Sequence, residues 1–201
     1  MGISENLRRV QDGIAEAERR AGREPGSVQE ALAKQEEMAG LRGHGIAPEW
    51  HLIGSLQKNK ARQAVGAFSL IHSLDGVELA VEIDKRAAKL GIVQDVLLEV
   101  NVSGEASKHG VRPEDALAVV REVSALPNIR IVGLMCIPPF TDDAEDSRPH
   151  FRALAGLLRE INGAGFPMHE LSMGMTQDYE VAAEEGATLV RVGTAIFGAR
   201  G

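Results

Sequence analysis

Cysteine is nearly absent from this chain of 201 residues, since Cys136 is its only one. A single cysteine cannot form a disulfide within the chain, which excludes a disulfide-stapled scaffold. Aromatic residues make up only 3% of the sequence, and no apolar run approaches the roughly 20 residues needed to span a bilayer. Residues 1–20 lack the apolar centre of a secretory signal. These absences predict a soluble protein of the reducing cytoplasm.

Basic residues are also fewer than acidic residues. The chain carries 22 Lys and Arg against 29 Asp and Glu, a net charge of −7, so its surface as a whole repels nucleic acid and anionic membranes. We therefore expect neither as a partner. The shares of hydrophobic residues (44%) and charged residues (25%) are typical of a globular domain and argue against disorder or collagen.

Several motifs that mark common functions are missing. The sequence contains neither G-x-G-x-x-G nor G-x-x-x-x-G-K-[ST], so the two commonest nucleotide-binding loops are excluded. It contains no H-x-H, H-E-x-x-H or C-x-x-C motif, and we therefore predict no metal site. A G-x-S-x-G elbow is absent too, which disfavours a serine hydrolase.

What the sequence does contain is a regular alternation of predicted helices and strands. Apolar residues at helical spacing predict a helix over residues 4–21, ended by Gly22, and a second helix that starts at Val28 with no strand between the two. From Trp50 onward, short apolar runs alternate with helical stretches, which is typical of a parallel sheet built from βα units. The runs cover residues 50–56, 68–75, 95–102, 129–138, 169–174 and 189–198, and the helices 77–90, 113–126, 145–162 and 176–186.

Near-continuous apolar strands indicate a sheet covered on both faces, as in a barrel or a doubly wound sheet. Without a dinucleotide-binding loop the barrel is the better interpretation, so we predict an α/β fold of the TIM-type (β/α) barrel class, forming a single domain over residues 1–201. The length of 201 residues falls short of the roughly 250 usual for eight βα units. Six strands, not eight, are recognisable.

The last two predicted strands carry the strongest candidate site. Each ends in a turn with glycine and hydroxyl residues, the first with Ser172 and Gly174 and the second with Gly193 and Thr194. Free backbone N–H groups, these hydroxyls and the Arg191 guanidinium would together form an anion-binding cradle. In barrels, phosphate commonly binds at the loops after the last two strands. The competing interpretation is that the glycines simply end strands and that Arg191 pairs with a carboxylate.

Histidine and lysine give weaker signals. His51 and His72 lie within apolar strands, where a histidine is more often a hydrogen-bonded core residue than a base or ligand. Lys58, Lys60 and Lys108 follow predicted strands and could reach a barrel mouth. A Schiff-base lysine works best on a strand that points into a pocket, and none of the six lysines lies within a strand.

Taken together, five segments resemble one family. They are HLIGSLQKNK (51–60), IHSLD (71–75), LLEVNVSGEASKHGV (97–111), GLMCIPP (133–139) and LSMGMTQDYEVAAEEGATLVRVGTAIFGAR (171–200). In order and spacing they are similar to the pyridoxal phosphate homeostasis (YggS/PROSC) family, whose members are fold-type III barrels like the N-terminal domain of alanine racemase. The match runs from about Val28 to Gly201, with roughly one βαβ unit less than the family pattern.

The resemblance implies a cytoplasmic, monomeric protein that binds pyridoxal 5′-phosphate and buffers this aldehyde or delivers it to apo-enzymes that depend on it. It implies no catalytic residues. An arginine near the ring nitrogen would weaken the electron-sink chemistry of the cofactor. The cofactor-binding residues that it implies are Ser172, Met173, Gly174, Arg191, Gly193 and Thr194.

The sequence departs from the family pattern at one place. The family has a strand with the Schiff-base lysine, a helix and a second strand before the helix that begins Val-Gln-Glu-Ala, whereas here Ser27 runs directly into Val28. We therefore predict that one βαβ unit and its lysine are missing at the Ser27–Val28 junction. Pyridoxal phosphate would then bind weakly or without a covalent bond, unless Lys58, Lys60 or Lys108 substitutes. A racemase-like enzyme and a non-functional remnant are the alternatives.

Overall fold

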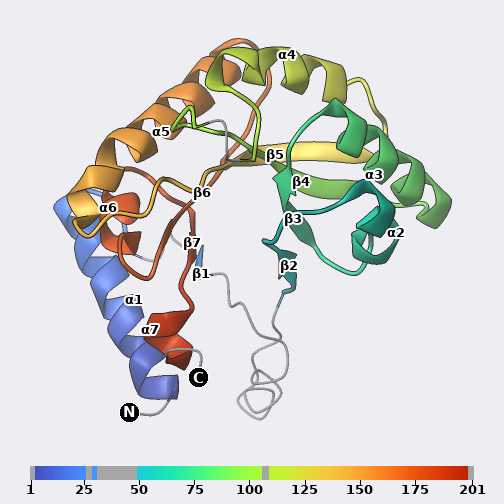
Figure 1. Cartoon of the computed structure of the whole chain (residues 1–201). Helices are drawn as coiled ribbons and strands as arrows, with labels where there is room; N and C mark the ends of the chain where they lie inside the picture. Colours follow the sequence, from blue (N-terminus) through green and yellow to red (C-terminus); the bar gives the residue numbers. More distant parts are fainter. Residues whose placement is uncertain (1–2, 26–28, 31–48, 106–108, 199–201) are drawn as a thin grey trace.

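The computed structural model describes residues 3–25, 29–30, 49–105 and 109–198. It contains one curved sheet with helices over its convex face (Figure 1). Seven parallel strands form the sheet in the order β1-β7-β6-β5-β4-β3-β2. Within these described ranges no pairing joins β1 to β2, so the sheet is an open, partial barrel, as the shortened sequence predicts.

The strands are β1 (Gln29–Glu30), β2 (His51–Leu52), β3 (Leu70–Leu74), β4 (Gln94–Glu99), β5 (Ile129–Met135), β6 (Glu170–Met175) and β7 (Leu189–Arg191). The α-helices are α1 (Ile3–Arg20), α2 (Ala61–Ala64), α3 (Val77–Leu90), α4 (Pro113–Val123), α5 (Arg148–Gly163), α6 (Tyr179–Glu184) and α7 (Thr194–Phe197). Two short 3₁₀ helices, η2 (Lys58–Lys60) and η3 (Ala144–Ser147), precede α2 and α5.

The two faces of the sheet are packed differently. Successive side chains of a strand point to opposite faces, so in β4 Val96 and Leu98 join the large apolar cluster beneath the helices. Leu97, between them, belongs to a second, smaller cluster on the inner face. That inner cluster consists of Leu70, Leu97, Val132, Met135 and Leu189. The inner face also carries the polar side chains that form the candidate site.

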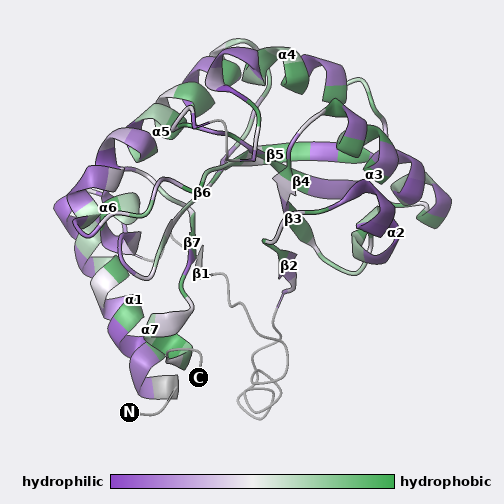
Figure 2. Cartoon of the chain, in the orientation of Figure 1, coloured by the Kyte–Doolittle hydropathy of each residue, from purple (hydrophilic) through white to green (hydrophobic). Residues whose placement is uncertain are grey.

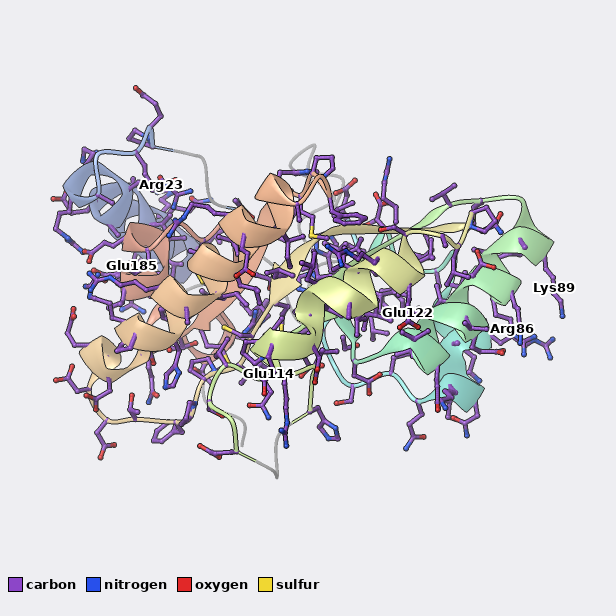
Figure 3. The ribbon with its side chains drawn as sticks, turned by 90° about the horizontal axis from the view of Figure 1, so that it is seen from above. Arg23, Arg86, Lys89, Glu114, Glu122 and Glu185 are labelled. Carbon is purple, nitrogen blue, oxygen red and sulfur yellow. The ribbon has the colours of Figure 1, made fainter. Side chains whose placement is uncertain are left out.

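The helices on the outer face are amphipathic. Helix α3 buries Leu79, Ile83 and Ala87, and hydrophobic and hydrophilic residues alternate along α3, α4 and α5 (Figure 2). Lys89 of α3 and Glu122 of α4 are exposed on the outer surface, where Figure 3 labels them. This pattern is expected of helices that cover a sheet on one side and face water on the other.

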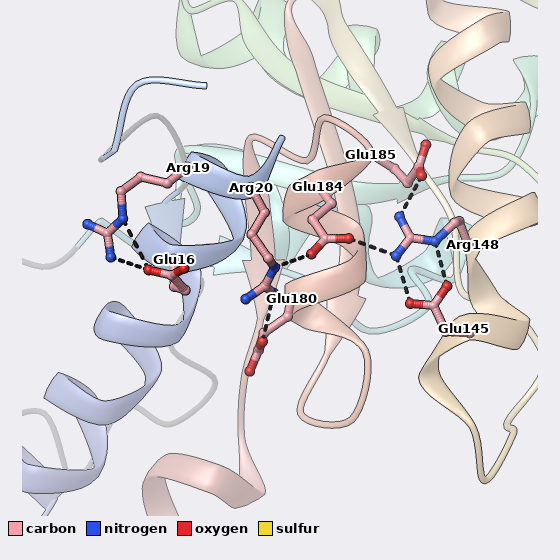
Figure 4. A network of polar contacts seen from close by, with 8 residues as sticks. All are labelled: Glu16, Arg19, Arg20, Glu145, Arg148, Glu180, Glu184 and Glu185. Carbon is pink, nitrogen blue, oxygen red and sulfur yellow. Dashed lines mark hydrogen bonds and ion pairs between the residues drawn. The ribbon is translucent and has the colours of Figure 1, made fainter. Parts of the chain in front are cut away.

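Helix α1 packs on the last part of the chain. Val10, Ile14 and Ala17 are buried, and this helix contacts α6 and α7. Arg20 donates to Glu184 at 2.7 Å and to Glu180 at 3.1 Å, which ties α1 to α6. Figure 4 shows this network and its continuation to α5. There the Arg148 guanidinium donates to Glu145, Glu184 and Glu185.

Most of the predicted elements are confirmed. Strands β2 to β7 each fall on one of the six predicted runs, and α3 has the predicted bounds, residues 77–90. Helix α1 starts and ends one residue earlier than predicted, and Gly22 follows it with a positive φ of 70°. In the part of the chain that the structure describes, no helix is long and apolar enough to cross a membrane.

The prediction for the segment after α1 is wrong where it can be checked. Gln29 and Glu30 were expected in a helix, but they form strand β1, which pairs in parallel with Leu189 and Val190 of β7. The backbone N–H and C=O groups along the free edge of β7 need partners, and β1 supplies them. The remainder of the predicted helix and the Ser27–Val28 junction lie outside the described residues.

Three other predictions need correction. The run 50–56 is strand only at His51–Leu52, and a helix that the sequence analysis did not predict, α2, lies between β2 and β3. The run 189–198 is strand only to Arg191, after which Thr194–Phe197 form α7. The helix expected over 176–186 begins at Tyr179. In both of these runs a glycine lies two residues after the last strand residue, Gly54 after β2 and Gly193 after β7.

Candidate functional site

A cavity of about 410 Å³ opens at the carboxyl ends of three neighbouring strands, β5, β6 and β7. Its walls are the loops that follow these strands, as expected for a ligand site on a parallel α/β sheet. The residues that line it are Pro139, Phe140, Thr141, Ala144, Met175, Thr176, Gln177, Asp178, Arg191, Gly193 and Thr194. We call this space the mouth cavity.

Among the residues that the structure describes, Arg191 is the only basic one that lines the mouth cavity. Its side chain is buried, with 7% of the residue exposed. It donates from Nη1 to the Ser172 hydroxyl at 2.6 Å and from Nη2 to the Cys136 carbonyl oxygen at 2.8 Å. Both partners are neutral oxygens, and within the described residues no carboxylate forms an ion pair with Arg191. The interpretation that Arg191 serves to pair with a carboxylate therefore has no ion pair to support it among the described residues.

Burial also governs the electrostatics of this cation. Desolvation lowers the pKa of Arg191 from its usual value, while Cys136, Asp178 and Glu99 act in the opposite direction. Burial likewise raises the pKa of the Glu99 carboxyl, with Asp75 adding to the rise and His109 opposing it. A buried cation with neutral hydrogen-bond partners is costly on its own and favours an anion nearby.

Two hydroxyl groups lie beside each other at the cavity wall. The Thr194 hydroxyl donates to the Thr176 oxygen at 3.0 Å, and the Ala195 amide approaches the same oxygen at 3.4 Å. Gly193 and Thr194 form the start of α7, where the first backbone N–H groups of a helix have no partner within it. This wall therefore offers several hydrogen-bond donors close together.

The remaining predicted site residues have other surroundings. The Met173 side chain is fully buried in the outer cluster, and Ser172 is fully buried as the partner of Arg191. Gly174 has a φ of 90°, and a Cβ added there would lie 2.5 Å from the Ala182 Cβ. Of the six predicted residues, Arg191, Gly193 and Thr194 line the mouth cavity, whereas Ser172, Met173 and Gly174 lie behind its wall.

Sequence reasoning missed the contribution of the loop after β5. Phe140 lines the mouth cavity and is 75% exposed, so it presents an aromatic ring at the rim. The sequence analysis assigned no functional residue to this segment. The signal that could have found it is an aromatic residue directly after Pro139, in a chain with only 3% aromatic residues.

Lysine is absent from the described lining of the mouth cavity. Lys58 pairs with the Glu78 carboxylate at the start of α3, and Lys60 lies in η2 beside it. Lys108 lies outside the described residues, so its candidacy stays open. The part of the chain that the structure describes likewise contains no group of three or more His, Cys, Asp or Glu that could hold a metal ion.

Comparison with known proteins gives consistent results. A model of the alanine racemase N-terminal domain family matches residues 12–201. The chain is similar to the pyridoxal phosphate homeostasis protein of Aquifex aeolicus, with 50% identity over 174 residues, 86% of this chain and 74% of that protein. It is similar to a solved structure of PipY from Synechococcus elongatus with pyridoxal phosphate bound: 32% identity, TM-score 0.75, covering 92% of this chain and 100% of that one.

One further relative bears on the length of the chain. The pyridoxal phosphate homeostasis protein of Pseudomonas aeruginosa is 39% identical over 229 aligned positions, which cover 98% of this chain and 96% of that protein. Because 229 positions exceed the 201 residues of this chain, the relative contains residues within the aligned region that have no counterpart here.

Proposed function

Because the chain belongs to the pyridoxal phosphate homeostasis proteins, a family with the alanine racemase N-terminal domain, we propose that it binds pyridoxal 5′-phosphate in the mouth cavity. The observation that carries the proposal is the buried Arg191 cation, whose hydrogen-bond partners are neutral oxygens. A phosphate-bearing ligand supplies the negative charge that is missing from the hydrogen-bond partners of Arg191. In the cell the protein would buffer pyridoxal phosphate or deliver it to apo-enzymes.

The residues of the cavity fit a phosphate and a ring. The phosphate would lie against Thr194, Gly193 and the Thr176 hydroxyl, which offer donors from two neighbouring loops. Arg191 would face the ligand from the floor, and Phe140 would contact the ring at the rim. Ser172 would act through Arg191.

Met173 and Gly174 do not line the mouth cavity, and in this proposal they have supporting roles. In this proposal they hold the turn after β6 in shape, Met173 from the outer cluster and Gly174 through its close approach to Ala182. The full proposed set is Ser172, Met173, Gly174, Arg191, Gly193 and Thr194, with Thr176 and Phe140 added.

We propose a non-covalent, non-catalytic complex. Bound pyridoxal phosphate supplies an electron sink to enzymes that hold it on a lysine beside an acid–base pair, and the described lining of the mouth cavity contains no lysine. The longer alignment with the Pseudomonas relative supports a missing internal segment, which we place at the Ser27–Val28 junction. Cytoplasmic location and a monomeric state complete the proposal.

A titration tests the binding function. We expect the full chain to bind pyridoxal phosphate, measured by calorimetry and by a change in ligand absorbance. Thr194→Val removes one donor to the phosphate and weakens binding by roughly threefold to tenfold, the effect of one hydrogen bond.

Ser69→Ala is the matched control, since it removes an exposed hydroxyl at the amino end of β3 and should leave binding unchanged. A wild-type chain that binds no pyridoxal phosphate contradicts the proposal and supports the non-functional remnant. Turnover of an amino acid by the loaded chain would instead support the racemase-like alternative.

A further inference from the structure

Four side chains on the inner face form a continuous hydrogen-bonded chain. Arg191 of β7 donates to the Ser172 hydroxyl of β6 at 2.6 Å. The Ser172 oxygen lies 2.9 Å from Nδ1 of His72 in β3, and Nε2 of His72 lies 3.1 Å from Nδ1 of His51 in β2. Strands β3 and β6 are separated in the sheet by β4 and β5, so this row of hydrogen-bonded side chains crosses the interior of the partial barrel.

This polar chain connects two cavities. Arg191 lines the mouth cavity at the carboxyl ends of the strands. His51 lines a second cavity of about 420 Å³, bordered by the first residues of β2 to β7, at their amino ends. Ser172 and His72 are fully buried between them, with 0% exposure. The four hydrogen-bonded side chains therefore run through the interior of the partial barrel, from the carboxyl ends of the strands to their amino ends.

The direction of the hydrogen bonds follows from Arg191 and from the burial of Ser172. A guanidinium can only donate, so the Ser172 oxygen accepts from Arg191. Ser172 is fully buried, and among its described contacts Nδ1 of His72 is the atom that can accept its hydroxyl proton. Burial, with the charges of His51 and Arg191, lowers the pKa of His72 to about 3, so His72 is neutral at pH 7, and with Nδ1 as an acceptor its single proton lies on Nε2. That proton is donated to Nδ1 of His51. Each of these hydrogen bonds is therefore donated in the direction from Arg191 toward His51.

We propose that His72 is a positioning residue for the pyridoxal phosphate site: by accepting the Ser172 proton it fixes the Ser172 oxygen toward Arg191 and holds the guanidinium at the floor of the mouth cavity. This inference rests on the proposed function. His72 does not touch the ligand in this account. It acts through Ser172, and the acceptor atom at its Nδ1 position is the property that matters.

A purely structural role for His72 makes a different prediction. If His72 only fills space in the interior, an apolar residue of similar volume should replace it without affecting the ligand. If its Nδ1 is needed as an acceptor, a side chain with an acceptor at that position should preserve binding and an apolar one should not. Asn places its amide oxygen close to the position of Nδ1, whereas Leu offers no acceptor.

The first test compares His72→Asn with His72→Leu in calorimetric titrations of the full chain with pyridoxal phosphate. We expect His72→Leu to weaken binding about tenfold, and His72→Asn to stay within about threefold of the wild type. His169→Asn is the matched control, because His169 is exposed and lies at the second cavity. Equal binding by His72→Leu and the wild type overturns the positioning role.

A second measurement needs no variant. Nitrogen-15 NMR of the imidazole rings in the wild-type chain reports which nitrogen of His72 carries the proton. We expect protonated Nε2 and unprotonated Nδ1, and a proton on Nδ1 overturns the inference even if His72→Leu does not fold. A wild-type chain that binds no pyridoxal phosphate overturns the proposed function, and the positioning role with it. Wild-type binding with unchanged His72→Leu binding overturns the positioning role alone.

Discussion

At the scale of single residues, Arg191 determines the character of the site. Its guanidinium is buried, and its hydrogen bonds go to the Ser172 hydroxyl and the Cys136 carbonyl oxygen. These bonds satisfy donors but do not neutralise charge, which is the basis of the proposed anion site. Gly193 and Thr194 add donors at the same wall. In our proposal this combination selects a ligand with a compact negative group.

Gly174 is the residue whose replacement tests the packing behind the site. Its φ of 90° is a conformation that side chains rarely adopt, and an added Cβ would lie 2.5 Å from the Ala182 Cβ. We expect Gly174→Ala to lower the free energy of unfolding by about 2–4 kcal/mol, from backbone strain and overpacking. Urea unfolding measures the change.

Gly156→Ala provides the control for this substitution. Gly156 lies within α5, and the nearest atom to an added Cβ is the end of the Arg159 side chain at 3.9 Å. Alanine is favoured over glycine in a helix by roughly 0.5–1 kcal/mol, so this variant should be slightly more stable than the wild type. Equal effects of the two substitutions would contradict the packing described at Gly174.

The buried His72 predicts a pH dependence of stability. Its pKa is about 3 in the folded chain and about 6.5 in an unfolded one. Between these values the unfolded state binds the proton more readily, so the free energy of unfolding is highest above about pH 6.5 and falls as the pH drops toward 3. The slope from this group is on the order of 1 kcal/mol per pH unit.

Urea unfolding between pH 4 and pH 8 checks this slope. The His72→Asn variant has no titrating group at that position, so its stability should fall less steeply on acidification than that of the wild type. Parallel profiles for the two proteins would show that His72 does not titrate as its burial implies.

At the scale of elements, helix α1 shows which contacts stabilise the fold. Ile14 is buried with 4% exposure, whereas the ion pairs to Glu180 and Glu184 are made by an Arg20 side chain that is 45% exposed. We expect Ile14→Ala to cost about 2–4 kcal/mol and Arg20→Ala less than about 1 kcal/mol. Thermal unfolding of both variants measures the difference, and a larger loss from Arg20→Ala would contradict it.

Local sequence pattern predicted most elements but not their ends. Helix α3 is predicted to the residue because its apolar spacing and Gly91 are local signals. Strand β1 could not be predicted, because Gln29 and Glu30 are strand only through pairing with Leu189 and Val190, far away in the sequence. Tertiary pairing there overrides local preference.

The site was predictable only where its residues are marked by local sequence signals. Arg191 ends a strand, and Gly193 and Thr194 follow it in sequence, so their place at the carboxyl ends of the strands could be inferred. The contact of His72 with Ser172 joins residues 100 positions apart, and no local pattern reports it. His72 is nonetheless the hydrogen-bonded core histidine that the sequence analysis expected.

At the scale of the whole molecule, the partial barrel retains the strands around the mouth cavity but is shorter than a related protein. The sheet retains the strands whose loops form the mouth cavity, while β1 pairs with the edge of β7. The relative from Pseudomonas aligns over 229 positions against 201 residues here, in keeping with the loss of an internal segment.

The most direct test of this account is borohydride reduction of the full chain saturated with pyridoxal phosphate, followed by measurement of its intact mass and peptide mapping. The account predicts binding by calorimetry together with an unchanged protein mass after reduction, because the ligand is held by Arg191, Gly193 and Thr194 rather than by a lysine. A stoichiometric mass increase located on Lys58, Lys60 or Lys108 would contradict it, because it would show that a substitute lysine had restored the covalent bond.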